Sequence, residues 1–135
     1  MVDFFAYTDG GSRGNPGPSG IGGVIYSPLR SVLAEISEYI GEATNNYAEY
    51  QAVLVTLKKV IEMGIKNIHF YIDSKLIVEQ LNGNYKVKNK KLKIVYDEIK
   101  ELIKEINITF THIRRNLNIH ADQLVNKAID KELKR

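Results

Sequence analysis

Three apolar segments near the start of the chain have the length and composition of strands. They are residues 2–8, 21–27 and 32–40. Residues 9–20, between the first two segments, are rich in Gly, Ser, Asn and Pro, which is typical of a loop. A short turn at 27–31, which contains Pro28, joins the last two segments. The pattern predicts an antiparallel meander, with Asp9 at the end of its first strand.

Apolar residues spaced three or four apart predict two helices after the meander. The first helix carries a stripe from Tyr50 to Ile61 and ends at Gly64, a residue suited to the left-handed conformation that closes a helix. Ser74 can cap a shorter helix that runs to the residue before Gly83. The stripe covers one side of the first helix, so this helix is expected to pack on a sheet.

The second half of the chain predicts two more helices. One has an apolar stripe from Leu92 to Ile106, and the other begins at about His120. The second of these turns a set of apolar residues inward: Ala121, Leu124, Val125, Ala128 and Ile129. The polar tail at 131–135 is expected to fray.

Two further strands are predicted at residues 67–72 and 107–113, where apolar residues alternate with polar or aromatic ones. Strands separated by helices favour a mixed α/β fold in which the helical crossovers place the later strands parallel to the first. Asp9 and Asp73 each follow a strand. If these strands are parallel neighbours, both carboxylates emerge at the same edge of the sheet.

Two more acids start from the sheet-facing sides of their helices. Glu49 lies one turn before Val53, and Asp122 lies three residues before Val125. Any single acid is most simply a surface group, but clustered acids near a core repel one another and lose hydration. A divalent cation removes both costs, and Mg²⁺ prefers oxygen ligands. Four acids could hold two ions, which can hydrolyse a phosphodiester without a nucleophilic side chain.

Composition narrows the class of protein. At 135 residues, with 44% hydrophobic and 26% charged residues, the whole chain (1–135) is expected to form one domain. It has no apolar run of membrane-spanning length and no secretory signal, so a cytoplasmic protein without membrane association is expected. The absence of cysteine excludes disulfides, thiolate zinc sites and cysteine nucleophiles. Any metal must therefore use oxygen or imidazole ligands.

The basic residues cluster. The formal net charge is only +3, but residues 85–93 (YKVKNKKLK) carry five lysines and no acid. Such a segment either contacts an anionic partner such as nucleic acid or forms a solvated approach to a helix.

Four segments, in order, resemble type 1 ribonuclease H. They are TDGGSRGNPGPSG (8–20), TNNYAEY (44–50), YIDSKLIVEQL (71–81) and ADQLVNKA (121–128). The resemblance covers nearly the whole chain and implies a ribonuclease H-like α/β fold, with a five-stranded mixed sheet of order 3-2-1-4-5 flanked by helices. It also implies an endonuclease that cuts the RNA strand of RNA/DNA hybrids with two Mg²⁺ ions, or Mn²⁺ in their place, leaving 3′-hydroxyl and 5′-phosphate ends. The residues it identifies as catalytic and metal-binding are Asp9, Glu49, Asp73 and Asp122.

The resemblance further implies residues that contact the hybrid. Asn15, Asn45 and Asn46 match positions whose amides or neighbouring backbone bond RNA 2′-hydroxyls and base edges across the minor groove. Their alternative role is turn and cap chemistry, since Asn is favoured in both places. Ser74 is expected to contact substrate as well as cap its helix.

The DNA strand has its own set of matching positions. Thr44 and Asn89 match a pocket for a DNA phosphate. Where some relatives add a basic residue, this chain has Glu42, so the pocket is either weaker or completed by another side chain. Tyr85 either packs on a DNA sugar or only anchors a loop. The lysines expected to contact phosphates without reading sequence are Lys86, Lys88, Lys90, Lys91 and Lys93.

One departure from the family concerns a mobile histidine that many relatives carry before the last acid. Only eight residues, 114–121, separate the last strand from Asp122, and their one histidine, His120, does not align with the mobile one. His120 either assists catalysis or packs at the helix start, and Arg114 or Arg115 is an electrostatic alternative. The histidines within strands, His69 and His112, are expected to be structural.

Other expectations concern partners. With the first strand beginning at residue 2, no separate hybrid-binding module is expected ahead of the domain, and hybrid affinity should be modest and salt-sensitive. We expect a monomer with no obligate protein partner. Two alternatives remain open: a hybrid-binding module without turnover, and a related nuclease that acts on DNA junctions or double-stranded RNA.

Overall fold

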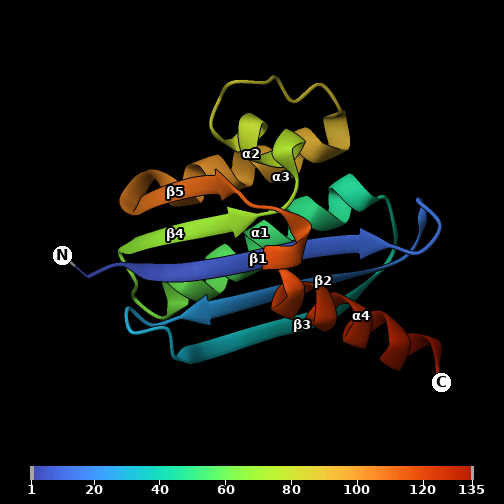
Figure 1. Cartoon of the computed structure of the whole chain (residues 1–135). Coiled ribbons are helices and arrows are strands. Elements are labelled where there is room, and N and C mark those ends of the chain that lie inside the picture. Colours follow the sequence, from blue (N-terminus) through green and yellow to red (C-terminus); the bar gives the residue numbers. More distant parts are fainter. Residues whose placement is uncertain (1, 135) are drawn as a thin grey trace.

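A computed structural model describes residues 2–134 and contains a five-stranded mixed sheet (Figure 1). The strands are β1 (Phe4–Ser12), β2 (Gly17–Tyr26), β3 (Val32–Ala43), β4 (Asn67–Ile72) and β5 (Asn107–His112). Their order in the sheet is β3-β2-β1-β4-β5. β1, β2 and β3 pair antiparallel, whereas β4 and β5 continue the sheet parallel to β1. The predicted fold class and strand order are confirmed.

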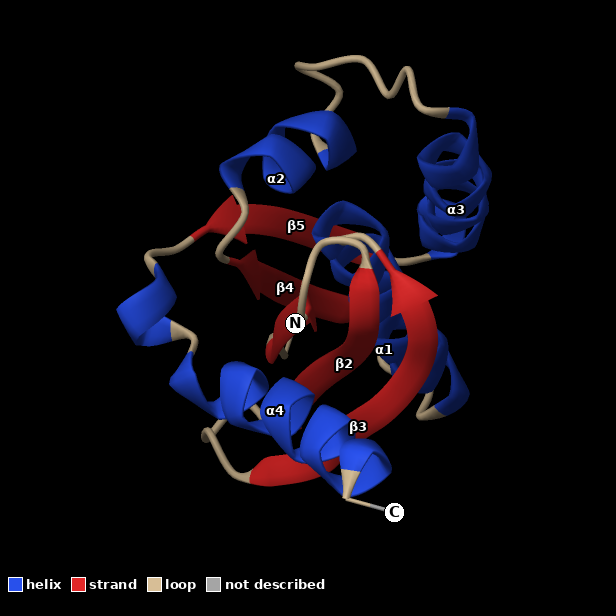
Figure 2. Cartoon of the chain, turned by 90° about the vertical axis from the view of Figure 1, so that its right-hand side faces the viewer, coloured by secondary structure: helices blue, strands red, loops and turns tan. Residues whose placement is uncertain are grey.

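Helices cover the two faces of the sheet unequally. They are α1 (Asn45–Glu62), α2 (Lys75–Leu81), α3 (Lys90–Leu102) and α4 (Ile119–Leu133), with short 3-10 turns η1 (Ile103–Glu105) and η2 (Arg115–Leu117). In Figure 2, α4 lies on one side of the sheet, beside β2 and β3, and α1 and α3 lie on the other. No helix within residues 2–134 has both the length and the apolar character needed to cross a bilayer.

The main hydrophobic core lies between the sheet and the layer formed by α1 and α3. Its largest fully buried side chains include Tyr50, Leu57, Phe70 and Ile99, none of which exposes measurable surface. Burying a side chain of this size stabilises the fold by about 1.5–3 kcal/mol. The core therefore fixes α1 against β1 and β4, the strands that carry two of the candidate acids.

The glycine-rich segment is mostly strand rather than loop. The prediction of a loop over residues 9–20 was wrong, because β1 continues to Ser12 and β2 begins at Gly17, leaving only a tight turn between them. A Cβ at Gly10 would lie 2.2 Å from the carbonyl carbon of Ala48, so glycine here serves close helix packing. Asp9 accordingly lies within a strand and not at its end.

Two helix boundaries also differ from the predictions. The third helix ends at Leu102, and Ile106 follows η1 immediately before β5, so Ile106 is not part of the helical stripe. The last helix extends through Leu133, so most of the tail expected to fray is helical, while Arg135 lies outside the described residues.

Candidate active site

Parallel pairing brings the first two acids together. The ladder between β1 and β4 ends with Thr8 opposite Ile72. Asp9 follows Thr8 and Asp73 follows Ile72, so the two acids lie at the same level, just beyond the last pair of the ladder. This is the convergence that two parallel neighbouring strands predict.

A glycine allows α1 to deliver the third acid. Because Gly10 has no side chain, the backbone of α1 approaches β1 at Ala48, one residue before Glu49. The Gly10 N–H donates a 2.5 Å hydrogen bond to Oε1 of Glu49. Glu49 is 6% exposed, and its other oxygen, Oε2, is buried and has no hydrogen-bond partner among residues 2–134.

A second glycine places α4. Gly22 pairs with Asp9 across β1 and β2, and a Cβ there would lie 2.2 Å from the carbonyl oxygen of Ala121. The first turn of α4 therefore rests directly on the strand beside Asp9, and Asp122 follows Ala121 in that turn. Close approach of two helices to two glycines thus brings Glu49 and Asp122 to the end of the sheet where strand pairing places Asp9 and Asp73.

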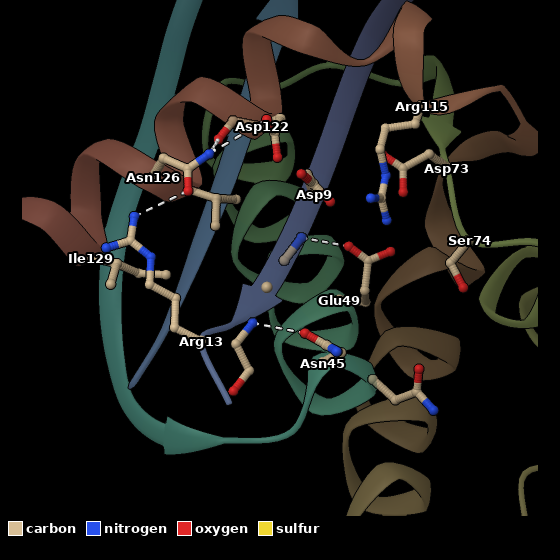
Figure 3. A pocket seen from close by; sticks show the side chains of 15 residues that line it. Asp9, Arg13, Asn45, Glu49, Asp73, Ser74, Arg115, Asp122, Asn126 and Ile129 are labelled. Atoms are coloured by element: carbon tan, nitrogen blue, oxygen red, sulfur yellow. Dashed lines mark hydrogen bonds between the residues drawn. The ribbon is translucent and has the colours of Figure 1, made fainter. Parts of the chain in front are cut away.

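The acids line a cleft of about 480 Å³ at this end of the sheet (Figure 3). Oxygen atoms of Asp9, Glu49 and Asp73 all lie within 4.8 Å of one another. Asp122 lines the same cleft on the α4 side, outside that group of three.

Burial and repulsion between neighbouring carboxylates shift Asp9 and Glu49 toward their neutral forms. Loss of hydration, with the charge of Asp73 and then of Asp122 adding to it, raises the pKa of Asp9 to about 7. Burial, followed by the charge of Asp9, raises the pKa of Glu49 well above its usual value. Without a cation, the cleft therefore does not accommodate its full negative charge at neutral pH.

The residues present fit a hard divalent cation. All the candidate ligands are carboxylate oxygens, which Mg²⁺ and Mn²⁺ accept. The buried Oε2 of Glu49 has no hydrogen-bond partner within the described residues, and a carboxylate oxygen of Glu49 lies within 4.8 Å of oxygens of Asp9 and Asp73. A cation at this position would neutralise the repulsion and give that oxygen a ligand role.

Polar residues around the acids complete the cleft. In Figure 3 the side chain of Arg115 points into the cleft beside Asp73. Ser74, also in the cleft, caps α2 by accepting a 3.4 Å hydrogen bond from the Ile77 N–H. On the opposite side, Asn126 donates to both the backbone oxygen (3.1 Å) and Oδ2 (3.4 Å) of Asp122.

The site residues predicted from the sequence did not include Arg13, Asn118 and Asn126. Arg13 pairs with Asp130 at 2.7 Å and donates to Asn126 at 3.1 Å, which joins the β1–β2 turn to α4. Asn126 stands four residues after Asp122, a spacing that places the two on one helix face and could have suggested the contact.

A second cleft of about 510 Å³ adjoins the first, and Asn45 and Asn46 line both. Asn15 lines only the second cleft, and its Oδ1 accepts from the Asn45 N–H at 2.9 Å. Oδ1 of Asn45 in turn accepts from the Ser12 N–H at 2.8 Å. These bonds occupy the amide oxygens of Asn15 and Asn45 and leave their NH₂ groups as the atoms available to donate.

Two helix caps form the wall of the second cleft. Thr44 caps α1 by accepting from the Tyr47 N–H at 3.2 Å, and Asn89 caps α3 by accepting from the Lys91 and Leu92 N–H groups at 2.9 and 3.0 Å. Lys91 also lines the cleft, with its ammonium group 5.1 Å from the centre of the Tyr47 ring. Glu42 is present there too. The structure thus brings Thr44 and Asn89 together in a cleft that also contains the positively charged Lys91 and the negatively charged Glu42.

Other candidate residues lie outside both clefts. Tyr85, Lys86 and Lys88 are exposed on the connection between α2 and α3. The two ring nitrogens of His120 contact the hydroxyl of Tyr26 at 3.0 Å and the carboxylate of Glu35, away from the acids. Arg114 precedes η2 and does not line the acidic cleft, whereas Arg115 does.

Comparison with known proteins gives a consistent result. A family profile described as "Reverse transcriptase-like" matches residues 7–128. The "Bifunctional protein Rv2228c" of Mycobacterium tuberculosis is 42% identical over 124 residues, which cover 90% of this chain and 34% of that protein. "Ribonuclease HI" of Halobacterium salinarum is 38% identical over 126 residues, which cover 93% of this chain and 63% of that protein. The chain thus spans about a third and under two thirds of these two relatives.

Solved structures match over almost the full length of both chains. LC11-RNase H1, isolated from compost by a metagenomic approach, is 46% identical with a TM-score of 0.92, covering 98% of this chain and 99% of that chain. A structure of LC11-RNase H1 in complex with RNA/DNA hybrid has 45% identity and a TM-score of 0.92, covering 96% of this chain and 99% of that chain. The chain therefore belongs to the ribonuclease H family, in its compact type 1 form.

Proposed function

We propose that this protein hydrolyses the RNA strand of RNA/DNA hybrids, with catalysis by Asp9, Glu49, Asp73 and Asp122. The observation that carries the proposal is the convergence of three carboxylates from β1, α1 and the end of β4, with oxygens within 4.8 Å. Membership of the ribonuclease H family and the hybrid complex of LC11-RNase H1 support the choice of substrate.

The four acids would hold Mg²⁺, or Mn²⁺ in its place, in this cleft. Two such ions, when bound, would supply activation of the attacking water and neutralisation of the charge on the leaving oxygen. Glu49 and Asp9 fix the inner part of the site, because Gly10 holds one oxygen of Glu49. Asp122 completes it from α4, and Arg115 adds positive charge beside Asp73. Attack of water at phosphorus, with cleavage of the bond between phosphorus and the 3′-oxygen and protonation of that oxygen, would leave 3′-hydroxyl and 5′-phosphate ends.

The second cleft holds the hybrid by backbone and minor-groove contacts. With their oxygens already bonded, Asn15 and Asn45 present NH₂ donors, which suit 2′-oxygens and the acceptors at base edges. Thr44 and Asn89 lie with Lys91 at the wall of this cleft, a setting for a DNA phosphate. Tyr85, Lys86 and Lys88 extend this surface and contact the hybrid without reading its sequence.

The test is cleavage of a labelled hybrid by the purified protein, with duplex DNA, duplex RNA and a DNA junction assayed beside it. With Mg²⁺ or Mn²⁺ the wild type should cut only the RNA of the hybrid, and Asp73→Asn should not. Asp3→Asn is the matched control, because Asp3 is an exposed acid just before the opposite end of β1. Absence of hybrid cleavage by the wild type, or full cleavage by Asp73→Asn, contradicts the proposal.

We further propose that the protein acts as a monomer in the cytoplasm. The lack of cysteine suits a reducing compartment. Sedimentation at assay concentrations should give the mass of one chain, and a larger species contradicts the monomer.

A further inference from the structure

Asn118 is a buried polar residue at the start of α4 that no part of the proposed chemistry uses directly. It is 1% exposed. Its Nδ2 donates to the backbone oxygen of Thr8 at 2.8 Å and to Oδ2 of Asp73 at 2.9 Å. One amide group therefore joins the backbone just before Asp9 to the side chain of Asp73.

The backbone of Asn118 connects to a further acid. Its carbonyl oxygen accepts a 3.1 Å hydrogen bond from the Asp122 N–H, in the first turn of α4. Asn118 thus contacts the strand, the loop and the helix that carry three of the four acids. The fourth, Glu49, is held separately by Gly10.

The local structure indicates that this arrangement is not ordinary helix capping. Asn is among the favoured residues at the position preceding a helix, because its side chain can accept from the first free N–H groups. Asn118 occupies that position but makes no such bond. Its side chain donates to Thr8 and Asp73 instead. The stability that a cap hydrogen bond would add to α4 is therefore absent, and the side chain serves the acidic cleft.

The orientation of the amide is determined by its surroundings. Both groups in contact with Nδ2 are acceptors, a carbonyl and a carboxylate, so only the NH₂ end can face them. Oδ1 of Asn118 is buried and has no hydrogen-bond partner in the part of the chain that the structure describes. The position therefore requires a side chain that donates hydrogen bonds, although its Oδ1 is left without a donor among the described residues.

We propose that Asn118 is a positioning residue that fixes the Asp73 carboxylate, and the start of α4, for divalent metal binding. This inference rests on the proposed function. By holding one oxygen of Asp73, the amide restricts rotation of that carboxylate and offsets part of its charge. Hydrogen bonds from neighbouring groups to metal ligands commonly contribute about 10- to 100-fold to metal affinity or activity.

Two substitutions separate the donor from the volume of the side chain. Asn118→Ala removes the amide, whereas Asn118→Asp keeps its shape but turns an acceptor toward Thr8 and Asp73. Asn82→Ala is the matched control, because Asn82 also donates from Nδ2 to a strand carbonyl, that of Phe110 at 3.2 Å, and lines neither cleft. Thermal unfolding is measured at pH 8 in chelator and with added Mn²⁺, and hybrid cleavage is measured against Mn²⁺ concentration.

Asn118→Ala should raise the Mn²⁺ concentration for half-maximal cleavage by about 10-fold or more and reduce the increase in unfolding temperature caused by Mn²⁺. Asn82→Ala should change neither quantity. In chelator, Asn118→Asp should unfold at a lower temperature than Asn118→Ala. A residue that only stabilised the fold would lower the unfolding temperature without changing the Mn²⁺ dependence.

Wild-type Mn²⁺ dependence in Asn118→Ala, or wild-type stability of Asn118→Asp in chelator, overturns the proposal. These outcomes differ from failure of the proposed function. If the wild type cleaves no hybrid, the nuclease assignment fails, while the order of unfolding temperatures in chelator still decides whether Asn118 holds Asp73 as a donor.

Discussion

The two adjoining clefts are built from similar polar residues but differ in how well those residues are satisfied. In the second cleft, Thr44, Asn45 and Asn89 all accept hydrogen bonds from backbone N–H groups. In the acidic cleft, one buried oxygen of Glu49 has no hydrogen-bond partner from the described residues, and Asp9 is held beside two other acids. Buried polar groups are normally paired, so the acidic cleft is the exception.

The difference suggests separate roles for the two clefts. The capping side chains of the second cleft are already held by hydrogen bonds at the starts of α1 and α3. In the proposed function, a bound cation offsets the repulsion between the carboxylates of the acidic cleft. Substitutions in the second cleft should therefore lower stability and substrate binding, whereas substitutions in the acidic cleft should abolish activity and raise stability.

The largest expected effect comes from Asp9→Asn. Loss of a ligand should reduce hybrid cleavage by more than about 100-fold, because even the partners of metal ligands contribute 10- to 100-fold. The same change removes a buried charge beside two acids, so the metal-free protein should gain on the order of 1–3 kcal/mol in free energy of unfolding at pH 8. Denaturant unfolding in chelator, compared with Asp3→Asn, checks the second part. A metal-free Asp9→Asn protein less stable than the wild type would contradict the claim that repulsion between acids destabilises the acidic cleft.

The pH dependence of this gain follows from the pKa of Asp9. Burial raises that pKa from 3.8 in the unfolded chain to about 7 in the folded protein, so the folded state binds the proton more tightly. The cost of ionising Asp9 is absent below about pH 4, grows as the pH rises and is complete above about pH 7. In chelator, the stability advantage of Asp9→Asn over the wild type should therefore grow from pH 4 to 7. Saturating Mn²⁺ should remove it, and an advantage that is independent of pH contradicts the account.

A substitution of a helix cap in the second cleft should change the free energy of unfolding in the opposite direction to Asp9→Asn. Asn89→Ala removes the acceptor for two N–H groups of α3 and should lower the free energy of unfolding by about 1 kcal/mol. The KM for hybrid should rise, with kcat unchanged, because no group near the acids is altered. Steady-state kinetics beside Asn107→Ala, whose side chain bonds Asn67 far from both clefts, provides the check. A fall in kcat with an unchanged KM would contradict a role of Asn89 in substrate binding.

The smallest expected effect concerns Lys91. If its ammonium group contacts one phosphate, Lys91→Ala should weaken binding a few-fold and lower the slope of log affinity against log salt by about 1. The exposed Lys59 on α1, which pairs with Glu62, supplies the matched control Lys59→Ala. Equal salt slopes for Lys91→Ala and the wild type would remove Lys91 from the binding surface.

Periodicity predicted the fold well because it reports which side of each element is buried. The parallel placement of β1 and β4 followed from the helical crossover, and it correctly put Asp9 and Asp73 at one level. The same reasoning failed for residues 9–20, where glycine content suggested a loop. Gly10 and Gly22 instead allow α1 and α4 to approach the sheet closely, a tertiary constraint that composition does not reveal.

The site was predictable only in part, for a related reason. Acids stand out in a sequence because their burial needs an explanation, and Glu49 was noticed from its place on a helical stripe. Asn118 and Asn126 did not stand out, since Asn at a helix start or on an exposed helix face has an ordinary explanation. The contact of Asn118 with Asp73 depends on how α4 packs over the sheet, which only the structure describes. The contact of Asn126 with Asp122 lies within α4, and the spacing of four residues could have suggested it.

The carboxylates of the acidic cleft should bind divalent cations. Anomalous scattering from crystals grown without metal and then soaked in Mn²⁺ tests this binding directly. The account predicts a strong anomalous peak between Asp9, Glu49 and Asp73, at oxygen–metal distances of about 2.0–2.2 Å. A map with no peak in the cleft at saturating Mn²⁺ and pH 8 would contradict it.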